Sequence, residues 1–375
     1  MQPLKIAVVI PKYGLLGGAE GFVADLTERV AARKEFDVHV FAHKWRAGKA
    51  PVTFHRVPVA AFPRWLGPVS FAWSAGRQIQ AGGFDIIHTH ERIFEADIFS
   101  FHGIPHLTWR KKVRQKAPGL FDLATAWLEK RCVTSPRLKK ILPVSSQVAD
   151  ELAGLYDIPA DRIQVSRPGV SLERFDALDR RRCRADIRGQ HNIADNEVVA
   201  LFVGMNFEVK NLDLVIQGLA GLAVESGEPA ARLLVVGRGN QEKYTEQARR
   251  AGVADRVVFA GEQREVERYF LASDIFVMPS VYDTFGLVVL EAMAAALPVI
   301  ISENVGAKDI VIPGTHGYIL PADARPAHMT GAMKRLMAPE ARRKTGKACR
   351  RQAERFSWDT LADHLAALYH EIGGR

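Results

Sequence analysis

Short apolar runs that end in glycine or polar residues recur along the chain, with helical stretches between them. The first run, Ile6–Ile10, precedes a glycine-rich loop and a segment whose apolar residues at 22, 23, 26 and 30 repeat near the 3.6-residue period of a helix. Similar runs follow at 36–41, 84–91, 97–103 and 140–144, and the pattern restarts at 198–204, 233–239, 257–262 and 274–278. Strands that alternate with helices predict an α/β fold with doubly wound parallel sheets. The restart predicts two Rossmann-like domains, for which 375 residues suffice.

The composition is typical of a globular protein in water, with 47% apolar and 25% charged residues. The three cysteines are far apart and form no CxxC pair, which argues against a disulfide framework and for a reducing compartment. The first apolar run is too short for a signal-peptide core, and no run approaches the ~20 residues of a membrane-spanning helix. We therefore expect a cytoplasmic protein.

One segment concentrates part of the net charge of +9, since five of the seven residues 110–116 are basic and aromatic residues flank them. An element that lies on an anionic membrane has this composition, each cation near such a surface being worth ~1 kcal/mol. A solvated basic face beside a buried helix has it equally. Nucleic acid is a weaker hypothesis, because no RNP, zinc-finger or helix-turn-helix pattern accompanies the charge. The membrane-facing candidates are Trp109, Arg110, Lys111, Lys112, Arg114 and Lys116, with Leu120, Phe121 and Trp127 nearby.

Polar side chains cluster at the end of one predicted strand in the first half of the chain, at His88, His90 and Glu91. Because open α/β sheets bind ligands beyond the carboxyl ends of their strands, these side chains are placed for contact with a ligand. A His-x-His pair beside glutamate could also hold a metal. A structural or substrate-contact role is commoner, so we predict no metal site and name His90 and Glu91 as candidate acceptor contacts.

A pair of carboxylates brackets a predicted helix start in the second half of the chain. Asp283 lies in a loop just before Phe285-Gly286, and Glu291 lies on the first turns of the Ala- and Leu-rich helix that starts at Leu287. Glycine lets a backbone approach a ligand closely, and the free N–H groups of a helix start attract anions. This arrangement suits a ligand with hydroxyls at both ends and phosphate between, which is the form of a nucleotide sugar.

The same stretch resembles the acidic-x7-acidic signature of the family 4 retaining glycosyltransferases, which have the GT-B architecture of two Rossmann-like domains facing a cleft. The resemblance implies that Asp283 holds sugar hydroxyls and that Glu291 holds the nucleotide ribose. It also implies that the backbone of Phe285, Gly286 and Leu287 faces the phosphate and the sugar. Asp283 stands where glutamate is commoner in the family.

Other motifs of this family occur in order along the chain. Residues 17–20 resemble its Gly-Gly-x-Glu loop, and His102-Gly103 resembles its His-Gly motif, whose histidine faces the transferred sugar. Lys210 matches the lysine that binds the diphosphate, but Met205 stands where that motif often has arginine, a departure that the lipopolysaccharide core group shares. The nucleotide-binding candidates that these motifs and the glycine-ended strands add are Gly17, Gly18, Gly204, Gly237 and Gly261.

The resemblance also sets the expected domain boundaries, because residues 167–175 resemble the family's junction between domains. It places an N-terminal acceptor-binding domain at 1–172, a nucleotide-sugar-binding domain at 173–355 and a C-terminal helix at 356–375 that crosses back to the first domain. The spacing of Trp358, Leu361, Leu365 and Leu368 independently predicts an amphipathic helix there.

The predicted function is a retaining transfer of a hexose from a nucleotide diphosphate sugar, with UDP as the default. The acceptor is expected to be a lipid-linked saccharide or polysaccharide, such as lipopolysaccharide core, reached from the cytoplasmic face of the inner membrane. The chain has no Asp-x-Asp motif, so Lys210, the Gly17-Gly18 loop and the helix start are expected to meet the diphosphate charge without a metal or other cofactor. Asp283, His102 and Lys210 are the expected catalytic residues. A nucleotide-sugar epimerase of the same fold and a non-catalytic saccharide- or membrane-binding protein stay open as alternatives.

Overall fold

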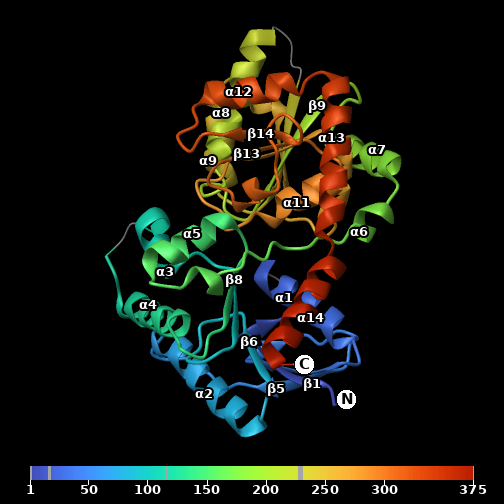
Figure 1. The fold of residues 1–375 in the computed structure, drawn as a ribbon. Coiled ribbons are helices and arrows are strands. Elements are labelled where there is room, and N and C mark those ends of the chain that lie inside the picture. The colour runs from blue at the N-terminus through green and yellow to red at the C-terminus, as the bar shows by residue number, and fades with distance from the viewer. Residues whose placement is uncertain (1, 16–17, 115–116, 227–230, 375) are drawn as a thin grey trace. The chain divides into compact units, whose positions relative to one another are not determined.

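The computed structural model describes residues 2–15, 18–114, 117–226 and 231–374, and the chain divides into two compact units. The first unit comprises residues 1–169 together with 358–375, and the second comprises residues 170–357. Each unit is built on one six-stranded sheet with helices packed against it (Figure 1). The prediction of an α/β fold with two parallel-sheet domains is confirmed.

The sheet of the first unit has the strand order β5-β3-β1-β6-β7-β8, and all neighbouring strands are parallel. The strand order reverses between β1 and β6, which makes the carboxyl ends of these two strands the expected place for a ligand. The strands are β1 (Leu4–Val9), β3 (Phe36–Ala42), β5 (Val52–Arg56), β6 (Ile86–Thr89), β7 (Ile98–Phe101) and β8 (Lys140–Pro143), and a small second sheet pairs β2 (Lys12–Tyr13) with β4 (Lys44–Trp45).

Helices of the first unit connect these strands, and the C-terminal helix joins the same core. Figure 1 shows α14, in red, beside α1, in blue, although the two lie far apart in the sequence. Trp358, Leu361, Leu365 and Tyr369 of α14 are buried in one cluster with residues of α1 and β1. The helices are α1 (Gly18–Ala31), α2 (Leu66–Gly82), α3 (His106–Thr108), a π-helix η1 (Trp109–Arg114), α4 (Leu120–Val133), α5 (Ser146–Leu155), a 3-10 turn η2 (Ala160–Arg162) and α14 (Trp358–Gly373).

The sheet of the second unit repeats this plan with the order β11-β10-β9-β12-β13-β14. Its central strand β9 is apolar and buried at every residue, as expected for a parallel strand covered on both faces. The order reverses between β9 and β12, so the loops that follow these two strands form the second expected ligand site. The strands are β9 (Val198–Gly204), β10 (Ala231–Gly237), β11 (Val257–Gly261), β12 (Ile275–Met278), β13 (Val299–Ser302) and β14 (Gly317–Leu320).

The second unit begins with two helices in a polar, arginine-rich stretch whose composition is typical of an exposed linker. Asp179 caps α7 by accepting hydrogen bonds from the backbone N–H groups of Arg181 and Arg182, and Arg188 is buried against Asp274 with Nη2 and Oδ2 2.6 Å apart. This stretch is therefore a packed part of the second unit and not an exposed linker. The helices are α6 (Glu173–Asp176), α7 (Arg180–Gln190), α8 (Leu212–Ser226), α9 (Gln241–Arg250), η3 (Ala254–Arg256), α10 (Val266–Ala272), α11 (Leu287–Ala294), η4 (Gly306–Asp309), α12 (Pro326–Arg335), α13 (Pro339–Ala353) and η5 (Glu354–Phe356).

Candidate active site

A glycine turn connects β12 to α11 in the second unit. Gly286 has φ 85°, in the left-handed region that favours glycine, and α11 starts at the next residue, Leu287. A Cβ on Gly286 would lie 2.7 Å from Cε of Met278 and 3.1 Å from Cγ1 of Val305, so a side chain there would also require its neighbours to shift. Phe285 is buried, and its carbonyl accepts a hydrogen bond from the backbone N–H of Ala307 at 2.7 Å. The start of α11 is therefore held in a fixed place.

Asp283 and Lys210 form an ion pair, although 73 positions separate them in the sequence. Asp283 follows β12 and Lys210 follows β9, and a backbone hydrogen bond of 2.8 Å from Val281 to Val209 joins the two loops. The Asp283 carboxylate also accepts a hydrogen bond from the backbone N–H of Phe285 at 3.3 Å. The side chains of Lys210 and Asp283 are 20% and 15% exposed, so both charges are accessible to a ligand while each neutralises the other. The structure thus brings together two of the three predicted catalytic residues.

Glu291 lies on the second turn of α11, where burial disfavours its charged form. Burial raises the pKa of Glu291 to about 7; the Arg174 guanidinium opposes the shift and the Glu267 carboxylate adds to it. Arg174 itself forms an ion pair with Glu267. In the sequence, Arg174 lies within the junction-like stretch 167–175, and no motif marks Glu267. No pattern along the sequence brings Glu267 close to Glu291, since it depends on the packing of α10 beside α11.

The structural reason for glycine differs among the glycine candidates of the second unit. A Cβ on Gly237 would lie 1.9 Å from the carbonyl oxygen of Gly204, and a Cβ on Gly204 would lie 2.9 Å from Cγ of Lys210. Close packing of β9 against β10 and of Gly204 against Lys210 thus explains these two residues without a ligand. At Gly261, φ is 71° and a Cβ would meet nothing within 4 Å, so the backbone there is open. Gly18 begins α1 in the first unit, whereas Gly17 lies outside the described residues.

His88 of β6 is buried, and protein groups occupy both of its ring nitrogens. Its Nδ1 lies 2.6 Å from the Tyr369 hydroxyl and its Nε2 lies 2.8 Å from Oγ of Ser100. The expectation that His88 contacts a ligand is therefore wrong, and neither nitrogen is left for a metal. Within the described ranges, no group of three or more His, Cys, Asp or Glu residues is arranged to hold a metal ion.

His90 and His102 are hydrogen-bonded to each other at the carboxyl edge of the first sheet. Nδ1 of His90 lies 2.8 Å from Nε2 of His102, and the His102 ring packs on Phe22 with centroids 4.6 Å apart. Burial lowers the pKa of His102 to about 4, and burial together with His88 and His102 lowers the pKa of His90 well below its usual value. Both rings are uncharged at neutral pH. The structure brings these two candidates together, and the predicted contact of His102 with the sugar stays a prediction.

Glu91 has a partner within the protein. Its Oε1 accepts hydrogen bonds from the backbone N–H of Arg92 at 2.8 Å and from Nη1 of the same residue at 3.0 Å. Arg92 also contacts the buried Glu129, whose Oε1 accepts hydrogen bonds from the backbone of His106 and the hydroxyl of Tyr156. No motif in the sequence marks this buried network, which ties Glu91 to α4 through Arg92, and the predicted contact of Glu91 with an acceptor stays a prediction.

The basic segment forms η1, and two of its cations bind carboxylates of the same unit. Arg114 donates to both oxygens of Asp122 at 2.5 Å, and Lys112 lies 2.8 Å from Glu151. Trp109 is half-buried with the Arg114 guanidinium over its ring. Lys111 is exposed, Arg110 is half-buried, and Lys116 lies outside the described residues. Two of the basic residues are therefore paired within the protein, and the membrane-facing role of the segment stays a prediction.

The helix that follows the basic segment, α4, exposes four large apolar side chains to solvent. Their exposed fractions are 68% for Leu120, 44% for Phe121, 54% for Leu123 and 53% for Trp127. Across the part of the chain that the structure describes, no helix combines the length and the apolar character needed to cross a membrane.

Two family models match the chain, one in each half. Residues 16–174 match Glycosyltransferase Family 4, and residues 184–355 match Glycosyl transferases group 1. A relative from Streptomyces bingchenggensis, described as a D-inositol 3-phosphate glycosyltransferase, is 27% identical over 410 residues that cover 96% of this chain and 86% of that one. The same activity is given for a Streptomyces avermitilis relative that is 26% identical and covers 96% of this chain and 84% of its own.

Solved structures of glycosyltransferases share the fold over almost the whole chain. WaaG, described as involved in lipopolysaccharide biosynthesis, superposes with a TM-score of 0.80 at 20% identity and covers 97% of this chain and 99% of its own. A sucrose-phosphate synthase from Thermosynechococcus elongatus gives 0.79 at 21% identity, with 99% of each chain covered. Anabaena HepE, described in complex with UDP and glucose, gives 0.71 at 18% identity and covers 98% of this chain and 100% of its own.

Proposed function

We propose that this chain, a glycosyltransferase with a family 4 domain in its first half and a group 1 domain in its second, transfers a hexose with retention from a nucleotide diphosphate sugar to a lipid-linked saccharide. The observation that carries the proposal is the pairing of Lys210 with Asp283 between the loops after β9 and β12, next to the start of α11. A cation, a carboxylate and a helix start at one switch point are the groups that a sugar diphosphate needs.

The second unit would bind the donor through these groups. The diphosphate would take the Lys210 ammonium from Asp283, and the N–H groups at the start of α11 would add further hydrogen bonds to its oxygens. Asp283, released from the ion pair, would accept hydrogen bonds from sugar hydroxyls. Glu291 would accept hydrogen bonds from the ribose, as its place eight residues further along the chain suggests.

In the transfer itself, the bond between the anomeric carbon and the phosphate oxygen breaks while the acceptor oxygen bonds to the same face of the sugar. The leaving phosphate oxygen takes the acceptor's proton, so the products are the glycoside and the nucleoside diphosphate. Lys210 and the helix start stabilise the negative charge that grows on the diphosphate. We propose that no metal or other cofactor takes part, because the chain has no Asp-x-Asp motif and supplies a cation of its own at this place.

UDP is the proposed nucleotide, and HepE supports it because that protein is described in complex with UDP and with UDP-glucose. Calorimetric titration with UDP, GDP and ADP in EDTA tests the donor site. We expect one nucleotide to bind tightly and Glu291→Ala to weaken its binding roughly ten- to a hundredfold, since a charged hydrogen bond to a hydroxyl is lost. If no nucleotide binds even with magnesium added, the proposal is wrong; an unchanged affinity in the variant removes the role of Glu291 alone.

The proposed acceptor is the saccharide of a membrane lipid, such as lipopolysaccharide core. WaaG supports this choice because it is described as involved in lipopolysaccharide biosynthesis. Incubation of a UDP-hexose with and without acceptor separates the alternatives. Consumption of donor that needs the lipid-linked saccharide supports transfer, whereas formation of an epimer without any acceptor would show an epimerase instead.

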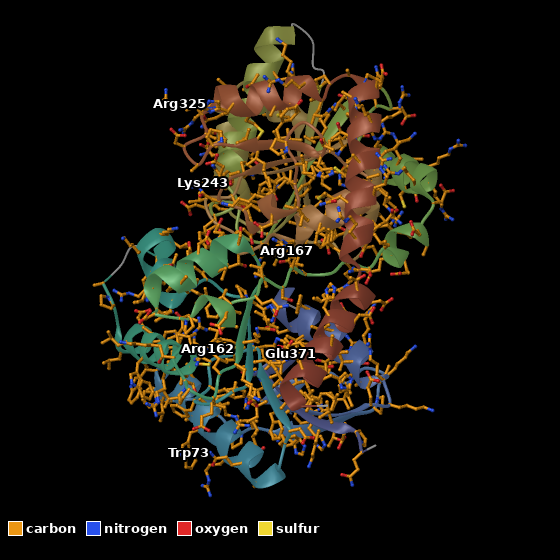
Figure 2. The ribbon with its side chains drawn as sticks, in the orientation of Figure 1. Trp73, Arg162, Arg167, Lys243, Arg325 and Glu371 are labelled. Carbon is orange, nitrogen blue, oxygen red and sulfur yellow. The ribbon has the colours of Figure 1, made fainter. Side chains whose placement is uncertain are left out.

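We also propose that the exposed apolar face of α4, with Lys111 nearby in the sequence, binds an anionic membrane surface. Sedimentation with vesicles rich in phosphatidylglycerol tests this, using Trp127→Ser against Trp73→Ser as a matched control. Trp73, labelled on α2 in Figure 2, is 55% exposed against 53% for Trp127. We expect only Trp127→Ser to release the protein from the vesicles; equal loss in both variants, or no binding by the wild type, would contradict the proposal.

A further inference from the structure

His102 is held from several sides by groups of its own unit. The planes of the His90 and His102 rings are within 12° of parallel, and their centroids are 5.1 Å apart. Together with the 2.8 Å between the two nitrogens, this describes an edge-to-edge hydrogen bond between nearly coplanar rings. Because Phe22 packs on the His102 ring and His90 occupies Nε2, Nδ1 is the one His102 nitrogen without a partner in the described part of the chain.

His90 is in turn fixed by the strands around it. Its backbone N–H donates to the carbonyl of Val9 at 2.9 Å, and its ring packs on that of His88 with centroids 4.3 Å apart. His88 cannot turn, since Tyr369 and Ser100 hold its two nitrogens. An ordered path of side chains therefore runs from Tyr369 on α14 through His88 and His90 to His102.

All three imidazoles are neutral, because burial lowers the pKa of His88 to about 3 and that of His102 to about 4, and also lowers the pKa of His90. A neutral imidazole has one N–H donor and one bare acceptor nitrogen. If His90 donates to Nε2 of His102, the proton of His102 is on Nδ1, which then donates to a hydroxyl. If His102 donates instead, its Nδ1 is bare and accepts. The hydrogen bond between the two rings thus decides what Nδ1 of His102 can do.

We infer that His90 is a positioning residue: its hydrogen bond fixes the orientation and the tautomer of His102 and so presents Nδ1 of His102 to a substrate hydroxyl. The inference rests on the proposed function, and it replaces the earlier assignment of His90 as a direct acceptor contact. The simpler view is that the pair only fills space under Phe22. That view predicts the same change in stability when His90 is substituted. It predicts no effect of the substitution on which nitrogen of His102 carries the proton.

A second histidine pair in the same unit provides a matched control. Nδ1 of His39 lies 2.8 Å from Nε2 of His55, with ring centroids 5.1 Å apart and planes within 18°. The geometry is nearly that of His90 and His102, but the pair lies within β3 and β5 rather than after a strand. His39→Phe therefore removes the same kind of hydrogen bond away from the proposed site.

The experiment compares the wild type with His90→Phe, His90→Asn and His39→Phe, in full-length protein checked for folding by circular dichroism. Phenylalanine keeps the ring without its nitrogens, whereas an asparagine amide reaches the place of Nδ1 and restores a partner for His102. Turnover is followed as UDP release from the UDP-hexose that the wild type consumes, and the His102 tautomer is read from its ring nitrogens by 15N NMR.

We expect His90→Phe to lower kcat roughly tenfold with the donor KM unchanged, the size of one hydrogen bond, and His90→Asn to recover most of the rate. The NMR signals of His102 should change from one tautomer to a mixture in His90→Phe only. An unchanged tautomer, or an equal loss of kcat in His39→Phe, overturns the inference.

If His90→Phe does not fold, His90→Gln, whose amide reaches past the Nδ1 position, takes its place with the same expected loss. A wild type that releases no nucleotide from any donor means that the proposed function has failed, whereas turnover that His90→Phe leaves intact means that this inference alone has failed.

Discussion

Both units place candidate residues after two neighbouring strands of the same parallel topology, at the order reversal in the second unit and one strand beyond it in the first, but the two pairs differ in charge. In the second unit Lys210 and Asp283 follow β9 and β12 and form an ion pair. In the first unit His90 and His102 follow β6 and β7, share a hydrogen bond and are kept neutral by burial. An ion pair can be opened by a competing charge, such as a diphosphate, whereas a neutral pair fixed by packing has no such competitor. The comparison indicates that an anionic ligand can rearrange the ion pair of the second unit. The neutral histidine pair of the first unit is expected to keep its arrangement when such a ligand binds.

Lys210→Ala should have the largest effect and tests the charged side of the comparison. It removes the proposed diphosphate cation and leaves the Asp283 carboxylate without its ion-pair partner where we propose that the diphosphate binds. We expect turnover to fall roughly a hundred- to a thousandfold. Removing one preorganised electrostatic group from the active site of an enzyme typically lowers kcat by about this factor. UDP release from the donor measures it.

The matched control for Lys210→Ala is Lys243→Ala in the same unit. Lys243 lies on α9 (Figure 2), with its side chain 45% exposed and 3.7 Å from Glu208. That substitution should leave turnover unchanged. Equal losses in the two variants would mean that net charge, and not the pairing with Asp283, governs the reaction.

The pH dependence of nucleotide binding comes next in size and depends on Glu291. Its pKa is raised to about 7, so the carboxyl is ionised above that pH and protonated below it. The ionised fraction increases from about a tenth at pH 6 to about nine tenths at pH 8. Because an ionised carboxylate is the stronger acceptor for ribose hydroxyls, we expect affinity to increase about tenfold over this range. Calorimetry at several pH values measures the change.

Glu291→Gln separates this effect from the titration of the nucleotide itself. Any pH dependence that comes from the phosphate groups remains in the variant, so the difference between the two curves belongs to Glu291. Parallel curves for wild type and variant would contradict the assignment.

Tyr369→Phe should have the smallest effect and tests the neutral side. It removes the hydroxyl 2.6 Å from Nδ1 of His88 without changing the ring that packs in the core. We expect the free energy of unfolding to fall by about 1 kcal/mol and turnover to change less than threefold or so, because the loss lies two rings away from His102. Urea denaturation and UDP release measure the two quantities. A loss of turnover as large as that of His90→Phe would show that the path from α14 controls His102 more directly than the packing suggests.

The sequence located the strand ends well because apolar runs and their terminal glycines or polar residues are local features. His102 after β7 and Asp283 after β12 are therefore where the pattern placed them. The pairing of Lys210 with Asp283 could not be read from the sequence, because it depends on β9 lying beside β12. The same holds for Lys112 and Arg114, whose cationic pattern is local but whose partners Glu151 and Asp122 come from other helices. Spacing also could not tell His88 from His90, since residues two apart in a strand share a face.

The packing of α14 in the first unit has a consequence for how the protein is synthesised. Residues 1–169 leave the ribosome first, but Trp358, Leu365 and Tyr369, which complete their core, come after the whole second unit. At ordinary elongation rates the intervening residues take roughly 10–40 s to translate. During that time α14 does not yet cover the apolar face of α1, and Nδ1 of His88 does not yet have the Tyr369 hydroxyl as its hydrogen-bond partner. The half of the protein that is made first is therefore finished last, and nascent chains stalled within the second unit should be the ones that chaperones retain.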